Sequence, residues 1–260
     1  MVEIGSANAP HSTGSQNALT ERDSALMGSE RPLGYAMLTP AMEDYLKTIY
    51  RLQQGGTTVS TNLLAEQMKF RPASVTGMIK KLAELKMVEH TPYYGVRLTS
   101  AGQRAALETL RHHRLLELYL TEFLGYSWDE VHEEAERLEH HISERLEARM
   151  FAALGEPTHD PHGDPIPTLT GDLPDLEMTA LTVLGVGERG IIAQVRSQDE
   201  EILRYLREEG FGLHVRVQLL SLSHIGGTLT VRVEGERDVT MSREIGDLLM
   251  VLVVPHPVAE

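Results

Sequence analysis

Histidine and carboxylate side chains recur at helical spacing in the middle of this 260-residue chain. Within one predicted helix, four of them stand at i, i+4, i+7 and i+8: His132, Glu136, Glu139 and His140. These offsets place all four on one face of the helix. The preceding predicted helix carries His113 and Glu117 four residues apart, and the first predicted helix contributes Asp44 just before its apolar face. Imidazole and carboxylate groups in such sets suit a divalent first-row metal ion.

A second interpretation of the same residues stays open. A helix rich in Glu and His is often only a solvated face, and a Glu–His pair four residues apart is common by chance. His112 and His141 point about 100° away from the better-placed histidines beside them, so we assign them no ligand role. The remaining histidines are expected on the surface or in loops: His11, His90, His159, His162, His214, His224 and His256.

The composition limits what a metal site in this chain contains. The chain has no cysteine, which removes thiolate ligands, disulfides and cysteine nucleophiles together. Hydrophobic residues make up 41% and charged residues 24%, the balance of a globular protein. No run approaches the roughly 18 apolar residues of a membrane span, and the N-terminus lacks a signal pattern. We therefore expect a cytoplasmic protein with no membrane partner.

The net charge of −14 argues against DNA binding until its distribution is examined. Residues 39–110 hold nine Lys/Arg against six Asp/Glu, whereas residues 111–260 hold thirteen against twenty-eight. All five lysines lie in the first of these segments. Screening limits the reach of distant charge to about 8–10 Å, so a locally basic module on an acidic body still attracts phosphates.

The elements of that basic segment predict a winged helix-turn-helix. A helix follows Thr39-Pro40 and ends at Gly55-Gly56. Two more helices follow, VSTNLLAEQMKF with Ser60 or Thr61 as N-cap, and RPASVTGMIKKLAELKMVEH after a break at Phe70-Arg71-Pro72. In the next stretch, MVEHTPYYGVRLTSAG, apolar and polar residues alternate on both sides of a turn, which predicts a β-hairpin. A generic three-helix domain is the alternative.

The fold class predicted for the whole chain is mainly α with a small β domain. A helix is expected over 100–124, and a second, beginning after Ser127, runs from Trp128 to Leu154. From 178 onward, five strands (ALTVL, GIIAQVR, LHVRVQLLSL, TLTVRVEG and LLMVLVV) and one short helix, DEEILRYLREEG, predict a small β-barrel. The domains are a disordered tail (1–38), a winged helix-turn-helix (39–110), a helical domain (111–176) and the barrel (177–260).

In order along the chain, the segments TPAMEDYLKTIY, RPASVTGMIKKL, YGVRLTSAG, RHHRLLELYL, VHEEAERLEHHIS and DPHGDPIP form a specific series. With them the chain resembles the diphtheria toxin repressor family of iron- and manganese-dependent regulators, from about Thr39 to Val254. The resemblance implies a winged-helix domain, a helical metal-binding and dimerisation domain, and an SH3-like barrel of the FeoA type. It further implies a homodimer that binds operator DNA and represses metal-uptake genes when metal is bound.

The resemblance also implies two metal sites per chain. The primary site takes Asp44, Glu136, Glu139 and His140. The ancillary site takes His113, Glu117 and His132, completed by Gln198 and Glu201 of the barrel. Iron-dependent members carry Met and Cys where this chain has Asp44 and Glu136, and the replacement of sulfur by hard oxygen favours Mn²⁺, with Fe²⁺ as the alternative.

Two positions depart from the manganese-dependent pattern. Those regulators carry a carboxylate one turn into the first helix, where this chain has Lys47. His132 is a feature of the iron-dependent branch. The primary site therefore resembles the manganese type and the ancillary site the iron type.

For DNA, the predicted recognition helix presents residues of two kinds. Those expected to face the bases are Arg71, Ala73, Ser74, Thr76 and Gly77. Those expected to bind phosphates are Lys80, Lys81 and Arg97, although Lys81 fits an ordinary solvated face equally well. Two other functions remain as alternatives: a metallohydrolase using the same carboxylate and His ligands, and a DNA-binding protein that senses an organic ligand through its barrel. The sequence contains no HExxH motif, nucleophile elbow or phosphate loop, which argues against the metallohydrolase.

Overall fold

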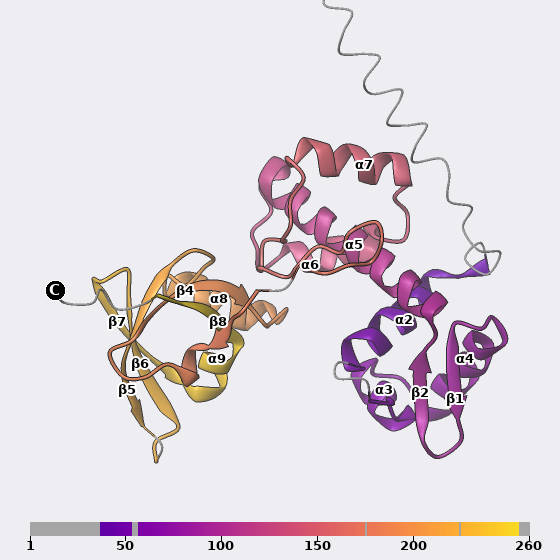
Figure 1. The fold of residues 1–260 in the computed structure, drawn as a ribbon, viewed down its shortest axis with the longest axis horizontal. Helices are drawn as coiled ribbons and strands as arrows, with labels where there is room; N and C mark the ends of the chain where they lie inside the picture. The colour runs from indigo at the N-terminus through magenta and orange to yellow at the C-terminus, as the bar shows by residue number, and fades with distance from the viewer. Residues whose placement is uncertain (1–36, 54–56, 175, 224, 255–260) are drawn as a thin grey trace, which may run out of the picture. The chain divides into compact units, whose positions relative to one another are not determined.

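The computed structural model describes residues 37–53, 57–174, 176–223 and 225–254 (Figure 1). The predicted disordered tail, apart from its last two residues, lies outside them. So do the predicted helix stop at Gly55-Gly56 and the histidines His11, His224 and His256. In the described parts no helix combines the length and apolar character that crossing a bilayer requires.

The first elements form the predicted winged helix. They are α2 (Pro40–Leu52), α3 (Thr61–Gln67), α4 (Pro72–Glu84), β1 (Val88–Thr91) and β2 (Gly95–Leu98). A proline stands in the first turn of α2 and of α4, where its missing N–H costs nothing. Ser60 caps α3 by accepting the Leu63 N–H at 3.1 Å. The apolar faces meet in a core that includes Leu46, Ile49, Leu64, Val75, Ile79 and Leu82.

The long helix α5 (Ser100–Leu124) follows the hairpin and agrees with the predicted bounds. Thr99 caps it by accepting the Gly102 N–H, and Gly125 ends it in the left-handed conformation at φ 75°. α5 packs against α2 of the winged helix and also against the helices that follow. It therefore contributes both to the winged helix and to the helical domain that follows it.

The helix predicted over 128–154 is wrong as a single element. The structure has α6 (Val131–Leu138) and α7 (Glu144–Ala153), separated by a turn. Ser143 caps α7 by accepting the Leu146 N–H, whereas the Ser127 hydroxyl donates to Glu130 and caps nothing. An internal serine that competes for backbone N–H groups explains the break.

A buried ionic group holds α7 against α5. The Arg111 Nε donates to Glu147 over 2.5 Å, and His112 Nε2 lies 3.1 Å from the other oxygen of that carboxylate. Burial opposes ionisation of Glu147, but the His112 and Arg111 partners outweigh it and lower its pKa. His112 is thus buried as a structural partner, which fixes the rotation of α5.

The C-terminal region is an antiparallel sheet with two helices and a 3₁₀ turn. Its elements are β3 (Thr179–Ala180), η2 (Leu181–Val183), β4 (Arg189–Val195), α8 (Glu200–Glu208), β5 (Arg216–Ser223), β6 (Thr228–Val233), β7 (Arg237–Ser242), α9 (Arg243–Leu248) and β8 (Leu249–Val254). The strand order is β3-β8-β4-β5-β6-β7. The fold class predicted from the sequence is confirmed.

Three details of this domain differ from the prediction. The segment ALTVL is mostly the 3₁₀ turn η2 rather than a strand. The strand β7 was not predicted; it is an edge strand in which only Val239 and Met241 are buried, so its apolar signal is weak. The short helix α9, capped by Ser242, was not predicted either.

The backbone of the loop Asp160-Pro-His-Gly packs against β4. Gly163 adopts φ +82°, and a Cβ there would stand 2.0 Å from the Ala193 carbonyl oxygen, so only glycine fits. The Val195 N–H donates to the His162 carbonyl over 2.8 Å. This close backbone approach holds the His162 side chain at a fixed place beside the helices.

Candidate metal centre

The first group of donor atoms joins α2 to the turn after α6. The ligand atoms of Asp44, Glu139 and His140 lie within 4.8 Å of one another. His140 Nε2 lies 2.9 Å from Asp44, and its Nδ1 lies 2.6 Å from Glu43. Burial lowers the pKa of His140, but the hydrogen bonds to Asp44 and Glu43 prevail and raise it to about 10. The sequence analysis missed Glu43, although it neighbours Asp44.

The second group lies between α5 and α6. The ligand atoms of His113, His132 and Glu136 lie within 4.8 Å of one another. Glu117 completes this group, because its Oε1 is 2.9 Å from His113 and 3.1 Å from His132. Burial lowers the pKa of His113, but the Glu117 and Glu139 carboxylates outweigh burial and raise it to about 9. Divalent metal ions displace protons from imidazoles held in this way.

Glu139 and Lys47 connect the two groups. Glu139 is 1% exposed, and its second oxygen lies 2.6 Å from His113. The Lys47 ammonium group donates to Glu139 over 2.5 Å and to Glu136 over 2.6 Å. Burial opposes ionisation of Glu136, but the charges of Lys47 and His113 keep its pKa low. The two groups therefore form one continuous network.

The structure brings together the seven helical residues predicted as ligands, with one difference in grouping. Glu136, predicted in the primary set, lies with His113 and His132, and reaches the primary group through Lys47. Its position four residues after His132 on α6 turns both side chains toward α5. Glu139 and His140 follow the end of α6, so the turn rather than the helical stripe aims His140 at α2.

The two barrel residues predicted as ligands, Gln198 and Glu201, belong to neither group of donor atoms. Glu201 is exposed on α8, and Gln198 precedes Asp199, whose side chain caps that helix. In the part of the chain that the structure describes, neither makes a hydrogen bond or ion pair with the metal-ligand groups. Their ligand role remains a prediction without geometric support. The barrel glutamine that meets the loop beside the centre is Gln194, whose amide donates to Asp164 over 2.6 Å.

Two residues that the sequence analysis did not assign lie beside the second group. His162 is fully buried, and its Nε2 lies 3.9 Å from Glu117 Oε1. Neither of its ring nitrogens, nor the Asp160 Oδ2 or the Glu117 Oε2, has a hydrogen-bond partner. Burial lowers the pKa of His162 and keeps it neutral, as a metal ligand must be. Because buried polar atoms without partners are costly, the His162 nitrogens and Glu117 Oε2 fit a cation, whereas Asp160 Oδ2 already has the Arg114 Nε 3.7 Å away. The available signal was the run Asp160-Pro-His-Gly.

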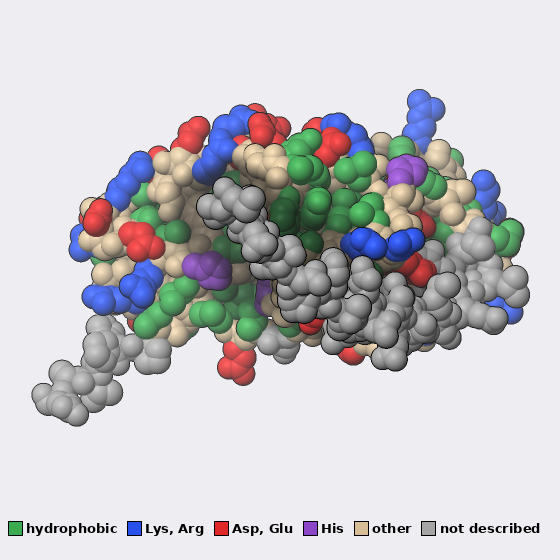
Figure 2. All heavy atoms as spheres, turned by 90° about the horizontal axis from the view of Figure 1, so that it is seen from above, with side chains coloured by type: hydrophobic (Ala, Val, Ile, Leu, Met, Phe, Trp, Pro, Cys, Tyr) green, Lys and Arg blue, Asp and Glu red, His purple; other side chains and the backbone are tan. Residues whose placement is uncertain are grey.

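The predicted DNA-binding residues lie on the solvent side of the winged helix. In α4, Val75, Ile79 and Leu82 face the core, while Arg71, Ala73, Ser74, Gly77, Lys80 and Lys81 are exposed and Thr76 is half-buried. Arg97 on β2 is exposed and lies 3.4 Å from Glu89 of β1. On the face of the molecule in Figure 2, basic side chains alternate with acidic ones and form no single broad patch.

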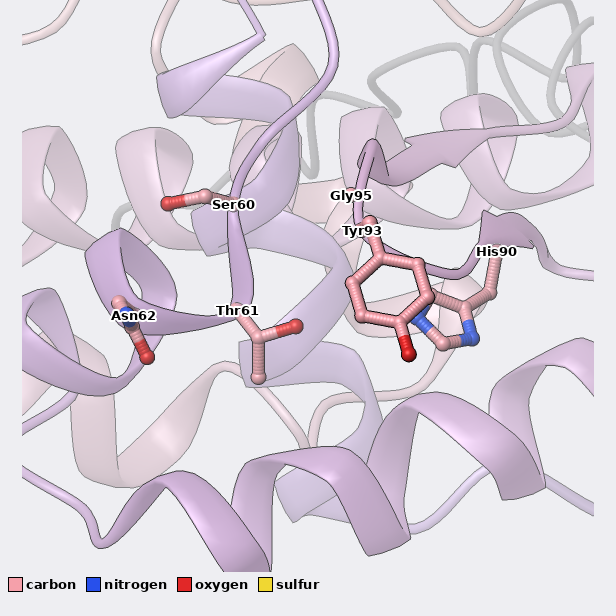
Figure 3. A pocket seen from close by; sticks show the side chains of 6 residues that line it. All are labelled: Ser60, Thr61, Asn62, His90, Tyr93 and Gly95. Carbon is pink, nitrogen blue, oxygen red and sulfur yellow. The ribbon is translucent and has the colours of Figure 1, made fainter.

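A hollow of about 200 Å³ lies between the start of α3 and the hairpin, lined by Ser60, Thr61, Asn62, His90, Tyr93 and Gly95 (Figure 3). Gly95, at φ +111°, lets the hairpin approach Val59, where an added Cβ would stand 2.4 Å from the carbonyl oxygen. The hollow is lined by one histidine and no carboxylate, so its lining does not match either group of donor atoms. Beside it, Val59 and Val96 exchange backbone hydrogen bonds of 2.8 and 2.9 Å, which hold the hairpin against the segment before α3.

Three family models match the chain in sequence. They are the iron dependent repressor N-terminal DNA binding domain over residues 37–96, the iron dependent repressor metal binding and dimerisation domain over 99–168, and the FeoA domain over 179–253. The iron-dependent repressor IdeR of Mycobacterium tuberculosis is 30% identical over 227 residues, which span 82% of this chain and 97% of IdeR.

Solved structures agree with these matches. A manganese-dependent transcriptional repressor in complex with manganese is 38% identical, with a TM-score of 0.76 over 82% of this chain and all of that one. The manganese regulator SloR is 30% identical, with a TM-score of 0.68 over 84% of this chain and all of that one. The similarity therefore extends over the helix-turn-helix, helical and barrel regions together.

The contrast between adjacent histidines tests the proposed ligands. We expect His140→Ala to weaken Mn²⁺ binding by at least the 10–100-fold that loss of a ligand's supporting partner typically costs. His141→Ala should change it little, because His141 is exposed while both ring nitrogens of His140 face carboxylates. Titration calorimetry of both variants measures the difference, and equal affinities would contradict the assignment.

Proposed function

This chain belongs to the iron-dependent repressor family, which includes the diphtheria toxin repressor and its manganese-dependent relatives, and from that premise we propose Mn²⁺ as its corepressor. The relatives are metal-dependent DNA-binding repressors, and this chain is such a repressor and not an enzyme. This excludes the metallohydrolase as a function of the chain. The proposal concerns the metal, the ligand residues and the coupling between metal and DNA.

Manganese is favoured by the donor atoms of the first group. Asp44, Glu43 and Glu139 offer oxygen, and His140 offers nitrogen, and the chain has no cysteine to supply a thiolate. Mn²⁺ binds most weakly in the first-row series, so a site selects it by ligand type and geometry rather than by affinity. A hard, carboxylate-rich set is what keeps Mn²⁺ competitive.

Iron is the second candidate, and a specific observation favours it. The second group is richer in nitrogen, since His113, His132 and the neutral His162 surround Glu117. Imidazole-rich sets suit Fe²⁺ as well as later metals. We propose two metal positions per chain, one at each group, with the first deciding the response to Mn²⁺.

The observation that carries the coupling is the contact between α2 and the turn after α6. Asp44 and Glu43 belong to the first helix of the winged helix-turn-helix, whereas His140 and Glu139 follow the helical domain's α6. A divalent cation bound there supplies positive charge that favours the approach of these carboxylates. Asp44 and His140 then hold the DNA-binding domain at one orientation, a bias no larger than the cation's differential affinity for the two states.

The exposed face of α4 provides the proposed DNA contacts. Arg71, Ala73, Ser74, Thr76 and Gly77 stand at its N-terminal half, where a recognition helix meets base edges. Lys80, Lys81 and Arg97 supply phosphate contacts. In a homodimer, two such helices reach successive major grooves about 34–36 Å apart. The protein would act in the cytoplasm on operators of metal-uptake genes.

Removal of metal tests the function as a whole. Protein treated with a chelator should lose specific binding to its own promoter DNA while its circular dichroism spectrum stays helical, because α2, α5 and α6 have buried apolar faces of their own. Anaerobic addition of either metal ion should restore binding. The restoring concentration, divided by the cellular concentration of that metal, should be lower for Mn²⁺ than for Fe²⁺. Full DNA affinity in the chelated protein would contradict the corepressor function.

Exchange of oxygen for sulfur tests the choice of metal. The double variant Asp44→Met with Glu136→Cys should respond better to iron, because thioether and thiolate ligands favour later metals. The half-saturating concentration of Mn²⁺ divided by that of Fe²⁺ should therefore rise. DNA binding measured against each free metal ion gives the ratio. An unchanged ratio would show that ligand softness at these positions does not set specificity.

Separate contacts on α4 should respond differently to substitution. Lys80→Ala should weaken binding to all sequences and lower the slope of log affinity against log salt by about 0.9, one phosphate's share. Arg71→Ala should relax base preference at a cost of about 1–3 kcal/mol on the preferred operator. Binding to a library of operator variants at several salt concentrations measures both, and an unaltered preference excludes Arg71 from base readout.

A further inference from the structure

A lysine lies at the middle of the metal-ligand network. Lys47 is 3% exposed, and its ammonium nitrogen contacts one carboxylate from each donor group, Glu139 of the first and Glu136 of the second. It extends from α2, whereas both partners come from α6 and the turn that follows. A buried ammonium group is stable only when it is paired, and two carboxylates at 2.5 and 2.6 Å pair it fully.

From this position we propose that Lys47 is an internal cation that raises the metal concentration at which this repressor responds. The inference rests on the proposed function and concerns the same centre. Lys47 neutralises Glu136 and Glu139 in the metal-free protein and bridges α2 to α6. It also fills the place between the two donor groups, so that place is closed to a third cation.

The direction of the effect follows from charge. Metal ions at the two donor groups must share Glu139 and Glu136 with the ammonium group and stand next to its positive charge. A unit charge and a divalent ion a few ångströms apart repel by more than the equivalent of tenfold in affinity, even at an effective dielectric constant of about 20. Lys47 therefore stabilises the metal-free form more than the metal-bound form.

Two substitutions at this position separate charge from packing. Lys47→Gln keeps a hydrogen-bond donor of similar reach but removes the charge, and we expect Mn²⁺ to bind about tenfold more tightly or better. The same variant should melt at a lower temperature than the wild type in chelator, because Glu136 and Glu139 then lose the ammonium group that pairs with both of them. Lys47→Glu places a carboxylate between the groups and should bind one more Mn²⁺ per chain than the wild type.

The control is Lys86→Gln, which removes one positive charge at an exposed site that contacts none of the ligands. Equilibrium dialysis with metal analysis gives affinity and stoichiometry for the four proteins, and thermal melts with and without Mn²⁺ give the stability difference. Lys86→Gln should match the wild type in both, so any general effect of net charge is subtracted.

The outcomes distinguish this inference from the function beneath it. If the wild type binds Mn²⁺ and Lys47→Gln binds it equally or more weakly, the internal-cation inference is overturned while the metal-dependent function stands. Unchanged stoichiometry in a folded Lys47→Glu variant overturns the claim that the lysine closes a cation position. If neither the wild type nor any variant binds divalent metal, the proposed function fails, and this inference fails with it.

Discussion

Concentrated negative charge between α2, α5 and α6 is the constraint on which the rest of this structure depends. Glu117, Glu136 and Glu139 stand within hydrogen-bond or ion-pair reach of a few imidazoles and one ammonium group, and two of these carboxylates are almost completely buried. Removal of carboxylates from water is costly unless cations approach them. The lysine and the imidazoles that pair with these carboxylates therefore stabilise the contacts between the three helices.

The surrounding fold keeps these groups in place through contacts of its own. The Arg111–Glu147–His112 group fixes the rotation of α5, which in turn sets where His113 and Glu117 point. On the other side, the Gly163 turn and its backbone contact with β4 hold His162 next to Glu117. Because this scaffold packs through its own apolar core and the buried Arg111–Glu147–His112 group, we expect a change of charge at the centre to affect the contact between α2 and the turn after α6 rather than to unfold the chain.

The barrel contributes to the centre through contacts with the helical region. Arg207 of α8 donates to the buried Asp129 over 2.6 Å, and Gln194 of β4 donates to Asp164 over 2.6 Å. Asp164 follows the loop that carries Asp160 and His162, and Asp129 follows Trp128, whose ring stacks on His162 with 5.7 Å between the ring centroids. The barrel thus contacts the loop beside the second donor group, while in the described structure Gln198 and Glu201 make no hydrogen bond or ion pair with either donor group.

Much of this could be predicted from the sequence, because local patterns carry it. The caps, prolines and apolar spacing determined the winged helix and α5, and the i, i+4 offsets of His113–Glu117 and His132–Glu136 survive because helical geometry is local. Only the tertiary structure decided the rest. The break at Ser143 turned His140 toward Asp44, and the packing of α2 on α5 placed Lys47 between the two donor groups. His162 lies beside the centre, forty-nine residues after His113, because the Gly163 turn packs against β4, and contacts so distant along the chain leave no periodic signal.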